Sequence, residues 1–389
     1  MSLTVQTNAL RTALSSLSKV SASKLALPVL ACVHLTAKTF QGLILEATDL
    51  EMGLRIYTPG ADDDLNIAVP AKTLAEVVAA AGEETLKLSI EDGQLLIAIC
   101  LANRKGIKSR IAIQDAGDYP SLPYCEHTAV TLAANLLKLA LKKIVIATSN
   151  DLARPALASV QIAQADAKIT FAAADGFRLA VQEVNGTLNL PGDQKSFCVP
   201  ASAVRKLIPM LPDDNQDIAI TVNEQVSQVG FSWPGFDVFI SLTESKFPDW
   251  KQIIPINFKH TISLSADFPQ AVKRAEVFGR LGGHLVSIAP SAEGAVVRGF
   301  KDDSGESRTV LEGVVMPFSL GLNAIFLAQG LEAIGVTAGV HLHLNTSNAP
   351  AMLTNGSRDY VYLIMPMLIN ETTQAAEAAE KSVAAESQA

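Results

Sequence analysis

The chain has 389 residues, of which 49% are hydrophobic and 18% are charged, and its formal net charge is −8. This length supports two or three independent cores, and the composition is that of a globular protein. The acidic balance argues against general electrostatic attachment to nucleic acid or to an anionic membrane, so any polyanion must be met by a local basic surface.

A strand followed by a helix occurs three times along the chain, at an interval of a little under a third of its length. Repeats of this length are whole domains rather than solenoid units, so the sequence predicts three similar domains. The three copies begin with Leu3-Thr4-Val5 before Leu10 and Leu14, Val130-Thr131-Leu132 before Leu136 and Leu137, and Ile262-Ser263-Leu264 before Phe268 and Val272.

A second helix is predicted in each copy after Val69-Pro70-Ala71, Val199-Pro200-Ala201 and Met316-Pro317. Helical spacing of apolar residues then predicts six helices, and short alternating runs predict strands. The fold class is therefore α+β, with two helices on strand-rich sheets in each repeat. The helices cover roughly Asn8–Lys19, Ala71–Ala81, Ala133–Ala147, Ala201–Leu211, Asp267–Arg280 and Ser319–Glu332, and the strands include Gly42–Ala47, Thr85–Ile90 and Gln94–Cys100.

Two proline-containing joints separate the copies, Asp118-Tyr119-Pro120-Ser121-Leu122-Pro123 and Phe247-Pro248-Asp249-Trp250 to Pro255. They predict domains over residues 1–125, 126–255 and 256–370. After Asn370 the composition changes to Ala, Glu, Ser, Thr and Gln, which predicts a disordered acidic tail over 371–389.

The predicted helices are basic within an acidic chain. They hold 11 Lys or Arg against 4 Asp or Glu, whereas the whole chain holds 31 against 39. Lys138 and Lys142 are four positions apart and therefore share a helix face, opposite an apolar stripe that includes Leu136 and Ile144. Either these are solvated faces with chance charge, or equivalent helices are turned towards one polyanion.

The usual signatures of catalysis and of cofactor binding are absent from the sequence. It has no Walker-type loop, no G-x-G-x-x-G, no G-x-S-x-G and no H-E-x-x-H, so neither an enzyme nor a cofactor is predicted. His341 and His343 alternate on a predicted strand, but they are more simply strand residues than metal ligands because no third ligand is near. Asp49 and Asp175 occupy equivalent strand ends, where an Asp side chain most simply bonds its own backbone; a catalytic role is the minority alternative.

The cysteines, Cys32, Cys100, Cys125 and Cys198, have no paired spacing and are interpreted as small buried residues of a reducing compartment. Met1 to Arg11 has no signal-peptide pattern, and no run approaches the ~18 apolar residues of a membrane span. A cytoplasmic protein is expected.

Five segments in register across the repeats carry a family resemblance. Together they closely resemble the bacterial sliding clamp, the beta subunit of the replicative DNA polymerase III, over residues 1 to about 369. The segments are Leu27-Pro28-Val29-Leu30, Ala47-Thr48-Asp49-Leu50-Glu51-Met52, Ala173-Ala174-Asp175-Gly176-Phe177-Arg178-Leu179-Ala180, Lys246-Phe247-Pro248-Asp249-Trp250 and Leu363-Ile364-Met365-Pro366-Met367.

The resemblance implies a non-catalytic processivity factor. Two copies would join head to tail as a homodimer, and their six domains would close a ring with helices around the hole. The ring would encircle double-stranded DNA without reading its sequence, which explains why the helices are basic. The resemblance implies a DNA contact at Lys24, and the basic pair that can follow the second Val-Pro is replaced here by Ala201-Ser202. The basic residues of the predicted helices that are expected to face DNA are Arg11, Lys72, Lys138, Lys142, Arg205, Lys206 and Lys273.

The resemblance also implies a hydrophobic pocket in which polymerases, the clamp loader and repair proteins insert a short linear motif. Without the resemblance, Leu363 to Met367 would simply be an edge strand. The implied pocket residues are Leu157, Gly176, Phe177, Arg178, Leu179, Pro248, Gln252, Ile253, Asn323, Phe326, Pro350, Leu363, Ile364, Met365, Pro366 and Met367.

Three of these residues depart from the family pattern, which often has His at Phe177, a basic residue at Gln252 and Tyr at Phe326. The pocket is therefore expected to be more apolar and to have an altered motif preference. The implied dimer interface places Val277 and Phe278 against an edge strand around Ile107 and Ile111. The alternatives are a specialised second clamp with a plasmid, repair or resistance role, and a multidomain hydrolase that uses Asp49 or Asp175.

Overall fold

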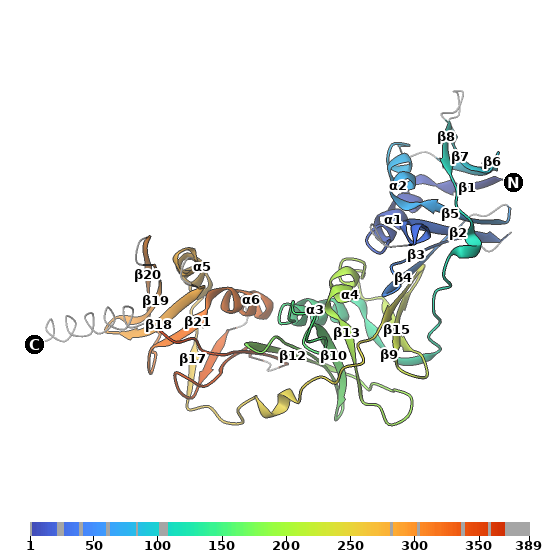
Figure 1. Cartoon of the computed structure of the whole chain (residues 1–389). Coiled ribbons are helices and arrows are strands. Elements are labelled where there is room, and N and C mark those ends of the chain that lie inside the picture. The colour runs from blue at the N-terminus through green and yellow to red at the C-terminus, as the bar shows by residue number, and fades with distance from the viewer. Residues whose placement is uncertain are drawn as a thin grey trace, which may run out of the picture. The chain divides into compact units, whose positions relative to one another are not determined.

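The computed structural model describes residues 2–21, 27–38, 42–59, 63–82, 85–100, 108–280, 283–301, 304–335, 339–356 and 359–369. Its contacts divide the chain into two compact units (Figure 1). The first unit is Met1–Lys138 with Thr187–Glu244, and the second is Leu139–Gly186 with Ser245–Ala389. This division cuts through the middle repeat, because strands of successive repeats pair within each unit. The three-domain division and the tail over 371–389 remain predictions.

The first unit contains two antiparallel sheets. The short sheet has the order β1 (Ser2–Gln6), β6 (Thr85–Glu91), β7 (Gln94–Cys100) and β8 (Lys108–Ala112). The long sheet has the order β5 (Leu65–Pro70), β2 (Cys32–Lys38), β3 (Gly42–Thr48), β4 (Met52–Thr58), β16 (Phe236–Ser241), β15 (Gln228–Trp233), β14 (Asp217–Val222) and β9 (His127–Ala133).

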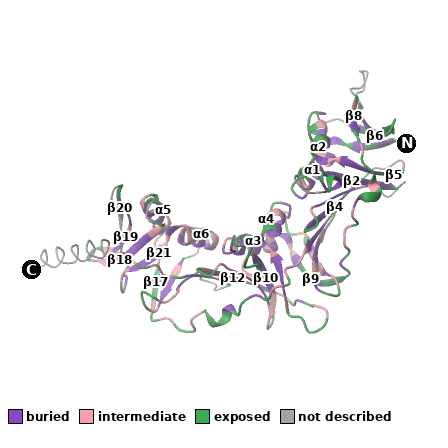
Figure 2. Cartoon of the chain, viewed as in Figure 1, coloured by how far each residue is buried: buried purple, intermediate pink, exposed green. Residues whose placement is uncertain are grey.

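The helices of the first unit bury one apolar stripe each, as amphipathic helices on a sheet do. In α1 (Thr7–Leu17) the buried residues include Leu10, Leu14 and Leu17. Figure 2 shows buried residues concentrated where the helices meet the strands. The unit also contains α2 (Ala71–Ala79), β13 (Ser196–Pro200), α4 (Ala201–Leu207) and the short 3₁₀ helices Pro28–Ala31 and Ala116–Asp118, and α3 (Ala134–Val145) begins in it.

The second unit has the same plan. Seven strands of its long sheet follow the order β10 (Ser159–Ala165), β11 (Lys168–Ala174), β12 (Arg178–Asn185), β24 (Tyr360–Ile364), β23 (Ala351–Thr354), β22 (His341–Leu344) and β17 (His260–Ser263). The short sheet has the order β20 (Gly305–Glu312), β19 (Gly294–Lys301), β18 (Leu285–Ser291) and β21 (Leu320–Asn323). Its helices are α5 (Phe268–Gly279), α6 (Ala324–Ile334) and the 3₁₀ turn Trp250–Gln252.

The predicted helices are confirmed to within a few residues except at the third proline marker. Met316-Pro317 does not open a helix, because the strand Leu320–Asn323 follows it and α6 begins only at Ala324. The junction that matches the first two copies is formed by Asn323. Its Oδ1 accepts hydrogen bonds from the backbone N–H groups of Ile325 (3.0 Å) and Phe326 (3.2 Å), which caps the helix.

The apolar stripe of α3 was also partly misassigned. Leu137, Ala140, Leu141 and Ile144 are buried, but Leu136 is 47% exposed. Residues 137, 140, 141 and 144 follow the i, i+3, i+4, i+7 spacing of one face, and Leu136 lies beside that face rather than on it.

His343 and the described cysteines are held within the fold. Both ring nitrogens of His343 meet hydroxyl groups, Nδ1 at 3.0 Å from Thr261 Oγ1 and Nε2 at 2.8 Å from Thr354 Oγ1. Within the described ranges, no three His, Cys, Asp or Glu gather as a metal site. Among the described residues, Cys32, Cys125 and Cys198 are buried, whereas the side chain of Cys100 lies outside the part that the structure describes. Burial raises the pKa of Cys125 to about 11.

No helix in the described part of the chain combines the length and apolarity needed to cross a membrane.

Candidate functional site

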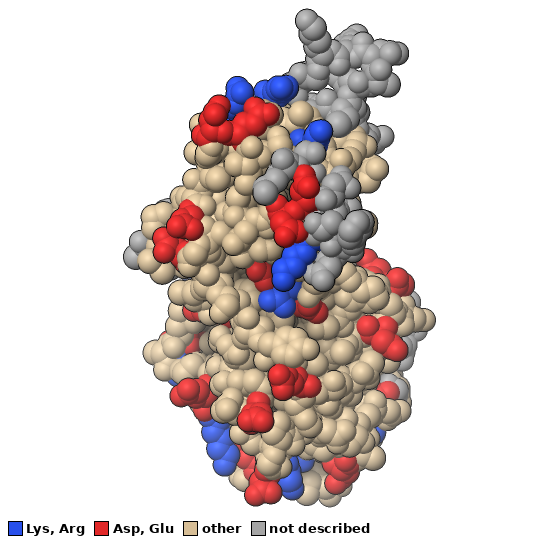
Figure 3. Space-filling view, turned by 90° about the vertical axis from the view of Figure 1, so that its right-hand side faces the viewer, with Lys and Arg blue, Asp and Glu red and all other residues tan. Residues whose placement is uncertain are grey.

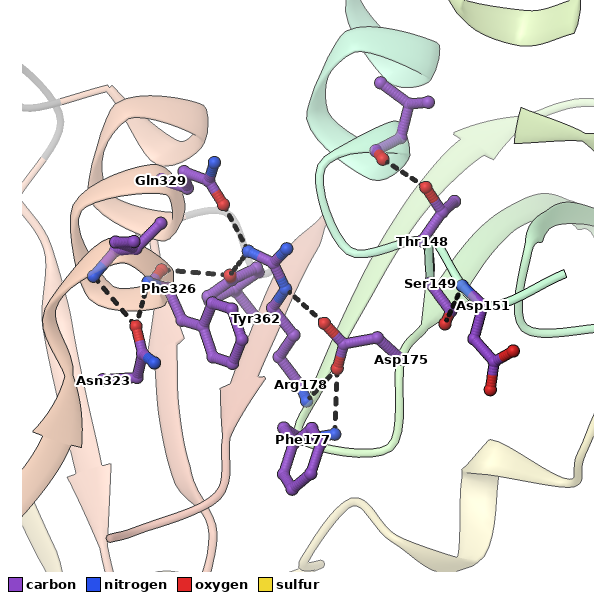
Figure 4. A network of polar contacts seen from close by, with 12 residues as sticks. Thr148, Ser149, Asp151, Asp175, Phe177, Arg178, Asn323, Phe326, Gln329 and Tyr362 are labelled. Atoms are coloured by element: carbon purple, nitrogen blue, oxygen red, sulfur yellow. Dashed lines mark hydrogen bonds and ion pairs between the residues drawn. The ribbon is translucent and has the colours of Figure 1, made fainter. Parts of the chain in front are cut away.

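The candidate partner-binding surface begins at a tight turn that Asp175 organises between β11 and β12. Its Oδ1 accepts hydrogen bonds from the N–H groups of Phe177 (2.9 Å) and Arg178 (3.0 Å) (Figure 4). Gly176 has φ of 96°, a left-handed conformation that glycine adopts without strain. The prediction that this carboxylate bonds its own backbone is confirmed, and a side chain committed in this way is not placed for catalysis.

Arg178 connects this turn to strand β24 and helix α6. Its Nε donates to Asp175 Oδ2 at 2.9 Å, and its Nη1 donates to Gln329 Oε1 and to Tyr362 Oη, the latter at 3.2 Å. The guanidinium also lies 4.1 Å from the centroid of the Phe326 ring. Only 9% of the Arg178 side chain is exposed, so the cation is compensated in a desolvated place. Figure 4 shows the guanidinium between the turn and α6.

Tyr362, in β24, joins this network to α6. Its hydroxyl donates to the carbonyl oxygen of Phe326 at 3.0 Å, and burial raises its pKa to about 12, with Arg178 opposing the rise. The phenol therefore stays protonated and can keep donating at neutral pH. A Cβ at Gly330 would overlap the Tyr362 ring, so α6 approaches this strand closely only because residue 330 is glycine.

The segment after β24 is fixed by hydrogen bonds on both flanks. Met365 N–H donates to the carbonyl oxygen of Phe177 at 2.8 Å, and Met367 N–H donates to that of Gly321 at 2.8 Å, with Pro366 between them. Beneath it, Leu179 pairs with Leu363 and Arg178 with Ile364. Leu179, Leu363 and Ile364 are each at most 3% exposed, so they form the floor rather than the accessible surface.

The accessible apolar side chains of this surface are Phe177 (63% exposed), Ile253 (48%) and Met365 (40%). Pro350 precedes Ala351, which pairs with Ile364, so it belongs to the same edge. The structure thus brings together Arg178, Asn323, Phe326 and the 363–367 segment by direct contacts.

Other predicted residues lie on flanking loops. Leu157 lies three residues after Arg154, and its N–H donates to the Arg154 carbonyl oxygen at 3.0 Å. Arg154 Nη1 is in turn 3.7 Å from the Cβ position of Gly176. The Pro248–Ile253 loop is tied to β10 by Trp250 Nε1, which donates to Gln161 Oε1 at 3.0 Å. Within this loop Gln252 Nε2 donates to Asp249 Oδ2 at 2.8 Å.

Sequence reasoning missed Gln329 and Tyr362 as partners of Arg178. Gln329 is three positions after Phe326 and so shares its helix face, which is a signal that sequence could have offered. Tyr362 lies 184 positions from Arg178, and only the pairing of β12 with β24 brings the two together.

A second turn of the same kind ends β3 in the first unit. Asp49 Oδ1 accepts from the N–H groups of Glu51 (3.1 Å) and Met52 (2.8 Å), and Asp49 Oδ2 lies 2.6 Å from Lys206 Nζ. Leu50 occupies the left-handed position here, with φ of 73°. This carboxylate too has a structural role.

A row of polar side chains then crosses the long sheet of the first unit. His34 pairs with Glu46, Glu46 with Arg55, and Arg55 with Asp237. Glu46 Oε2 lies 3.1 Å from His34 Nδ1, and Glu46 Oε1 accepts from Arg55 Nε at 2.7 Å. Tyr119, from the joint after the first repeat, stacks on the His34 ring with centroids 4.9 Å apart.

The basic helices are less uniformly available than the sequence predicted. Lys138 lies four positions before Lys142 on one face of α3, but only 12% of its side chain is exposed and its Nζ lies 2.7 Å from Asp213 Oδ1. Lys206 is likewise paired with Asp49, and Arg11 donates to the carbonyl oxygen of Gly82 at 2.5 Å. Of the predicted DNA-facing residues, four are exposed: Lys72, Lys142, Arg205 and Lys273. Lys24 lies outside the described residues. Figure 3 shows one face, on which both signs of charge are scattered in small groups.

The predicted interface residues differ in exposure. Val277 is 51% exposed, while Phe278 is half-buried, with Cε1 3.6 Å from the Cβ position of Gly305. Ile111 is only 4% exposed and contributes its side chain to its own unit. Ile107 lies outside the described residues. The strands β8 and β20 are each terminal in their sheets and present an open edge.

The chain is similar to bacterial sliding clamps. The family model of the DNA polymerase III beta subunit N-terminal domain matches residues 1–123, and that of its central domain matches residues 131–249. The beta sliding clamp of Synechococcus elongatus is 27% identical, over 94% of this chain and 99% of the relative, and that of Bacillus subtilis is 25% identical over the same shares.

Solved structures of the same kind superpose on nearly the whole chain. The Bacillus subtilis sliding clamp gives a TM-score of 0.85 at 21% identity, and the DNA polymerase III beta subunit of Thermotoga maritima gives 0.84 at 22% identity. Each comparison covers 95% of this chain and 100% of the other. The chain belongs to the family of DNA polymerase III beta subunits, the bacterial beta sliding clamps.

Proposed function

We propose that the chain is a non-enzymatic clamp in the cytoplasm, two copies of which close head to tail around double-stranded DNA and tether the replicative polymerase. The observation that carries the proposal is the match of two beta-subunit family models to successive repeats, in a chain that repeats its strand-and-helix unit three times. Residues 1–125, 126–255 and 256–370 are then the three domains of one subunit, and the ring has six.

The grip on DNA is weak and independent of sequence. Exposed Lys72, Lys142, Arg205 and Lys273 suit contacts with phosphates, which position a duplex without reading its bases. Lys138 and Lys206 are already paired with Asp213 and Asp49, which lowers the positive charge that the helices present. Processivity then comes from the closed ring rather than from affinity.

Topological binding is tested on nicked circular DNA. The protein is loaded by its cognate clamp loader, the loaded fraction is isolated by gel filtration, and the circle is then cut once. We expect release after cutting and retention on the uncut circle. Equal retention on both forms would mean ordinary DNA affinity and would contradict the clamp.

The partner-binding surface takes a short linear motif with apolar anchors. Phe177, Ile253 and Met365 offer exposed apolar contact, while Asp175 and Arg178 are satisfied by each other and by the protein. A peptide therefore gains mainly from apolar burial against a surface that is already ordered.

A specialised second clamp is the alternative favoured by the departures at Phe177, Gln252 and Phe326. Grafting Phe177→His, Gln252→Arg and Phe326→Tyr adds hydrogen-bonding groups, and an Arg at 252 would meet Asp249. We expect the order of affinities across a panel of clamp-binding peptides to change. Affinities that stay the same would contradict an altered motif preference.

The dimer joins open sheet edges flanked by Val277 and Phe278. Phe278→Glu should yield monomers in sedimentation velocity. Since Phe278 also packs beside Gly305, Val277→Glu serves as the matched variant, because its exposed side chain can change without loss of the fold. A dimer that survives both changes would refute this interface.

A further inference from the structure

A cleft of about 520 Å³ is lined by residues of the first unit, none of which belongs to the candidate partner-binding surface. It is formed where the chain enters β9, by the turn between β14 and β15, and by the connection after β12. Its volume is within the range of ligand-binding clefts. The residues that line it are Tyr124, Glu126, His127, Pro191, Asn223, Glu224 and Gln225.

The walls of this cleft are held in place by their own hydrogen bonds. Asn223 Oδ1 accepts from the N–H groups of Ser227 (2.9 Å) and Gln228 (3.0 Å), which fixes the β14–β15 turn. His127, which also lines the cleft, has its Nε2 3.1 Å from the carbonyl oxygen of Asn189. A ligand therefore meets a surface that needs little reordering.

The charge of the cleft is negative and uncompensated. Glu126 and Glu224 are both exposed, and neither forms an ion pair with the residues that the structure describes; no Lys or Arg lines the cleft. Tyr124 adds an aromatic ring that is 73% exposed. Two carboxylates beside an aromatic face suit a guanidinium or ammonium group, through ion pairs and a cation–π contact.

The exposure of the lining residues indicates whether the cleft suits a small ion or a larger partner. None of its lining residues is buried, so a small free cation would keep most of its water there. An Arg or Lys side chain on a longer segment can place its charged end between the carboxylates while its stem packs on Tyr124. We propose that this cleft is a second docking site, for a basic segment of a partner protein.

The proposal is tested with a fluorescein-labelled Arg-Gly-Arg-Gly-Arg amide, by anisotropy at about 150 mM salt. Glu126→Gln with Glu224→Gln should weaken binding about tenfold, since two ion pairs are lost. Tyr124→Leu should weaken it roughly threefold, and Tyr124→Phe, which keeps the ring, should leave it within twofold. Hydrogen exchange of the complex should show protection over residues 124–127 and 223–225.

The matched control is Glu293→Gln with Glu332→Gln, which removes the same charge from two exposed sites without ion pairs elsewhere in the described chain. It should change binding by less than twofold. Equal weakening by both double variants would reduce the effect to general attraction by an acidic protein and overturn the proposal. Spermine is the other arm: if it displaces the peptide at equal concentration with the same dependence on Glu126, Glu224 and Tyr124, the cleft is a polyamine site instead.

Discussion

The two places where strands of successive repeats pair, β4 with β16 in the first unit and β12 with β24 in the second, begin alike and then diverge. Each starts with an Asp whose Oδ1 accepts the N–H groups two and three positions later. At the third position the first unit has Met52, which is 1% exposed, and the second has Arg178. One backbone device thus supports either a plain apolar packing residue or the centre of a polar network.

The residues that cross the two long sheets at matching positions are polar or charged in the first unit and mostly apolar in the second. The first unit crosses its sheet with His34, Glu46, Arg55 and Asp237, whereas the second crosses with Gln161, Ala172, Val181 and Val361. Both rows are antiparallel and in register. Strand pairing is therefore the same in the two sheets although the side chains along these rows differ. Those side chains can vary between polar and apolar without a change of fold.

The largest expected effect comes from giving the second unit the residue of the first. Arg178→Met leaves Asp175, whose side chain is only 12% exposed, without its cation, so we expect a loss of about 3–5 kcal/mol in the unfolding free energy of that unit. Trp250 lies in the second unit and Trp233 in the first, and the chain has 2 Trp, so a Trp233→Phe background reports the second unit by fluorescence.

The matched change in the first unit is Lys206→Met, which removes the cation beside Asp49. Lys206 is 36% exposed, so the expected loss is at most about 1 kcal/mol, measured through Trp233 in a Trp250→Phe background. Losses of equal size in the two units would mean that Arg178 is no more integrated than a surface ion pair.

Gly176→Ala should cost the second unit roughly 1–2 kcal/mol, because a Cβ is strained at positive φ. Space is not the cause, since the nearest atom, Arg154 Nη1, would be 3.7 Å from that Cβ. Denaturant titration followed through Trp250 measures it. No change would show that the turn relaxes to another conformation.

The polar row makes the first unit sensitive to pH. Burial alone would lower the pKa of His34, but hydrogen bonds to Glu46 and Asn66 and the charge of Glu46 outweigh it, so the pKa is raised from 6.5. For Glu46, burial would raise the pKa, but the bonds and charges of His34 and Arg55 prevail and lower it from 4.5.

The contribution of His34 is therefore full below pH 6.5 and is lost as pH rises through its folded-state pKa, while that of Glu46 is present above pH 4.5 and is lost on acidification. We expect about 1 kcal/mol less stability of the first unit at pH 9 than at pH 6. His34→Gln should flatten this slope, measured through Trp233. The same slope in the variant would assign the effect to another group.

Leu50→Gly gives the smallest expected effect and the opposite sign. Leu50 has φ of 73° and is 56% exposed, so glycine relieves strain at little cost in burial. The larger chain entropy of glycine offsets part of this, leaving a gain of about 0.5 kcal/mol in the first unit. A clear loss of stability would mean that the exposed Leu50 side chain makes contacts worth more than the strain.

Sequence predicted the strand-and-helix order because apolar spacing reports which face of each element is buried. It failed at Met316-Pro317, where a proline marker was read as a helix start although the capping side chain, Asn323, lies further on. Neither the spacing of apolar residues nor the position of a proline shows whether the helix begins after Pro317 or after Asn323.

The family resemblance supplied the candidate residues of the partner-binding surface, which remain a prediction, but it did not supply the contacts that join them. Arg178 and Phe326 were identified, yet their contacts through Tyr362 and Gln329 depend on strand pairing across long separations. The pairing of Lys138 with Asp213 is of the same kind, at a separation of 75 positions. Local periodicity contains no information about such partners.

The double anchoring of the 365–367 backbone, at Phe177 and at Gly321, has a kinetic consequence. A binding surface that is already ordered requires no slow rearrangement before a ligand docks, so association rates should vary little among peptides. Differences in affinity would then appear as residence times. The rate at which one partner replaces another would then be set by the dissociation rate of the bound motif from Met365 and Phe177.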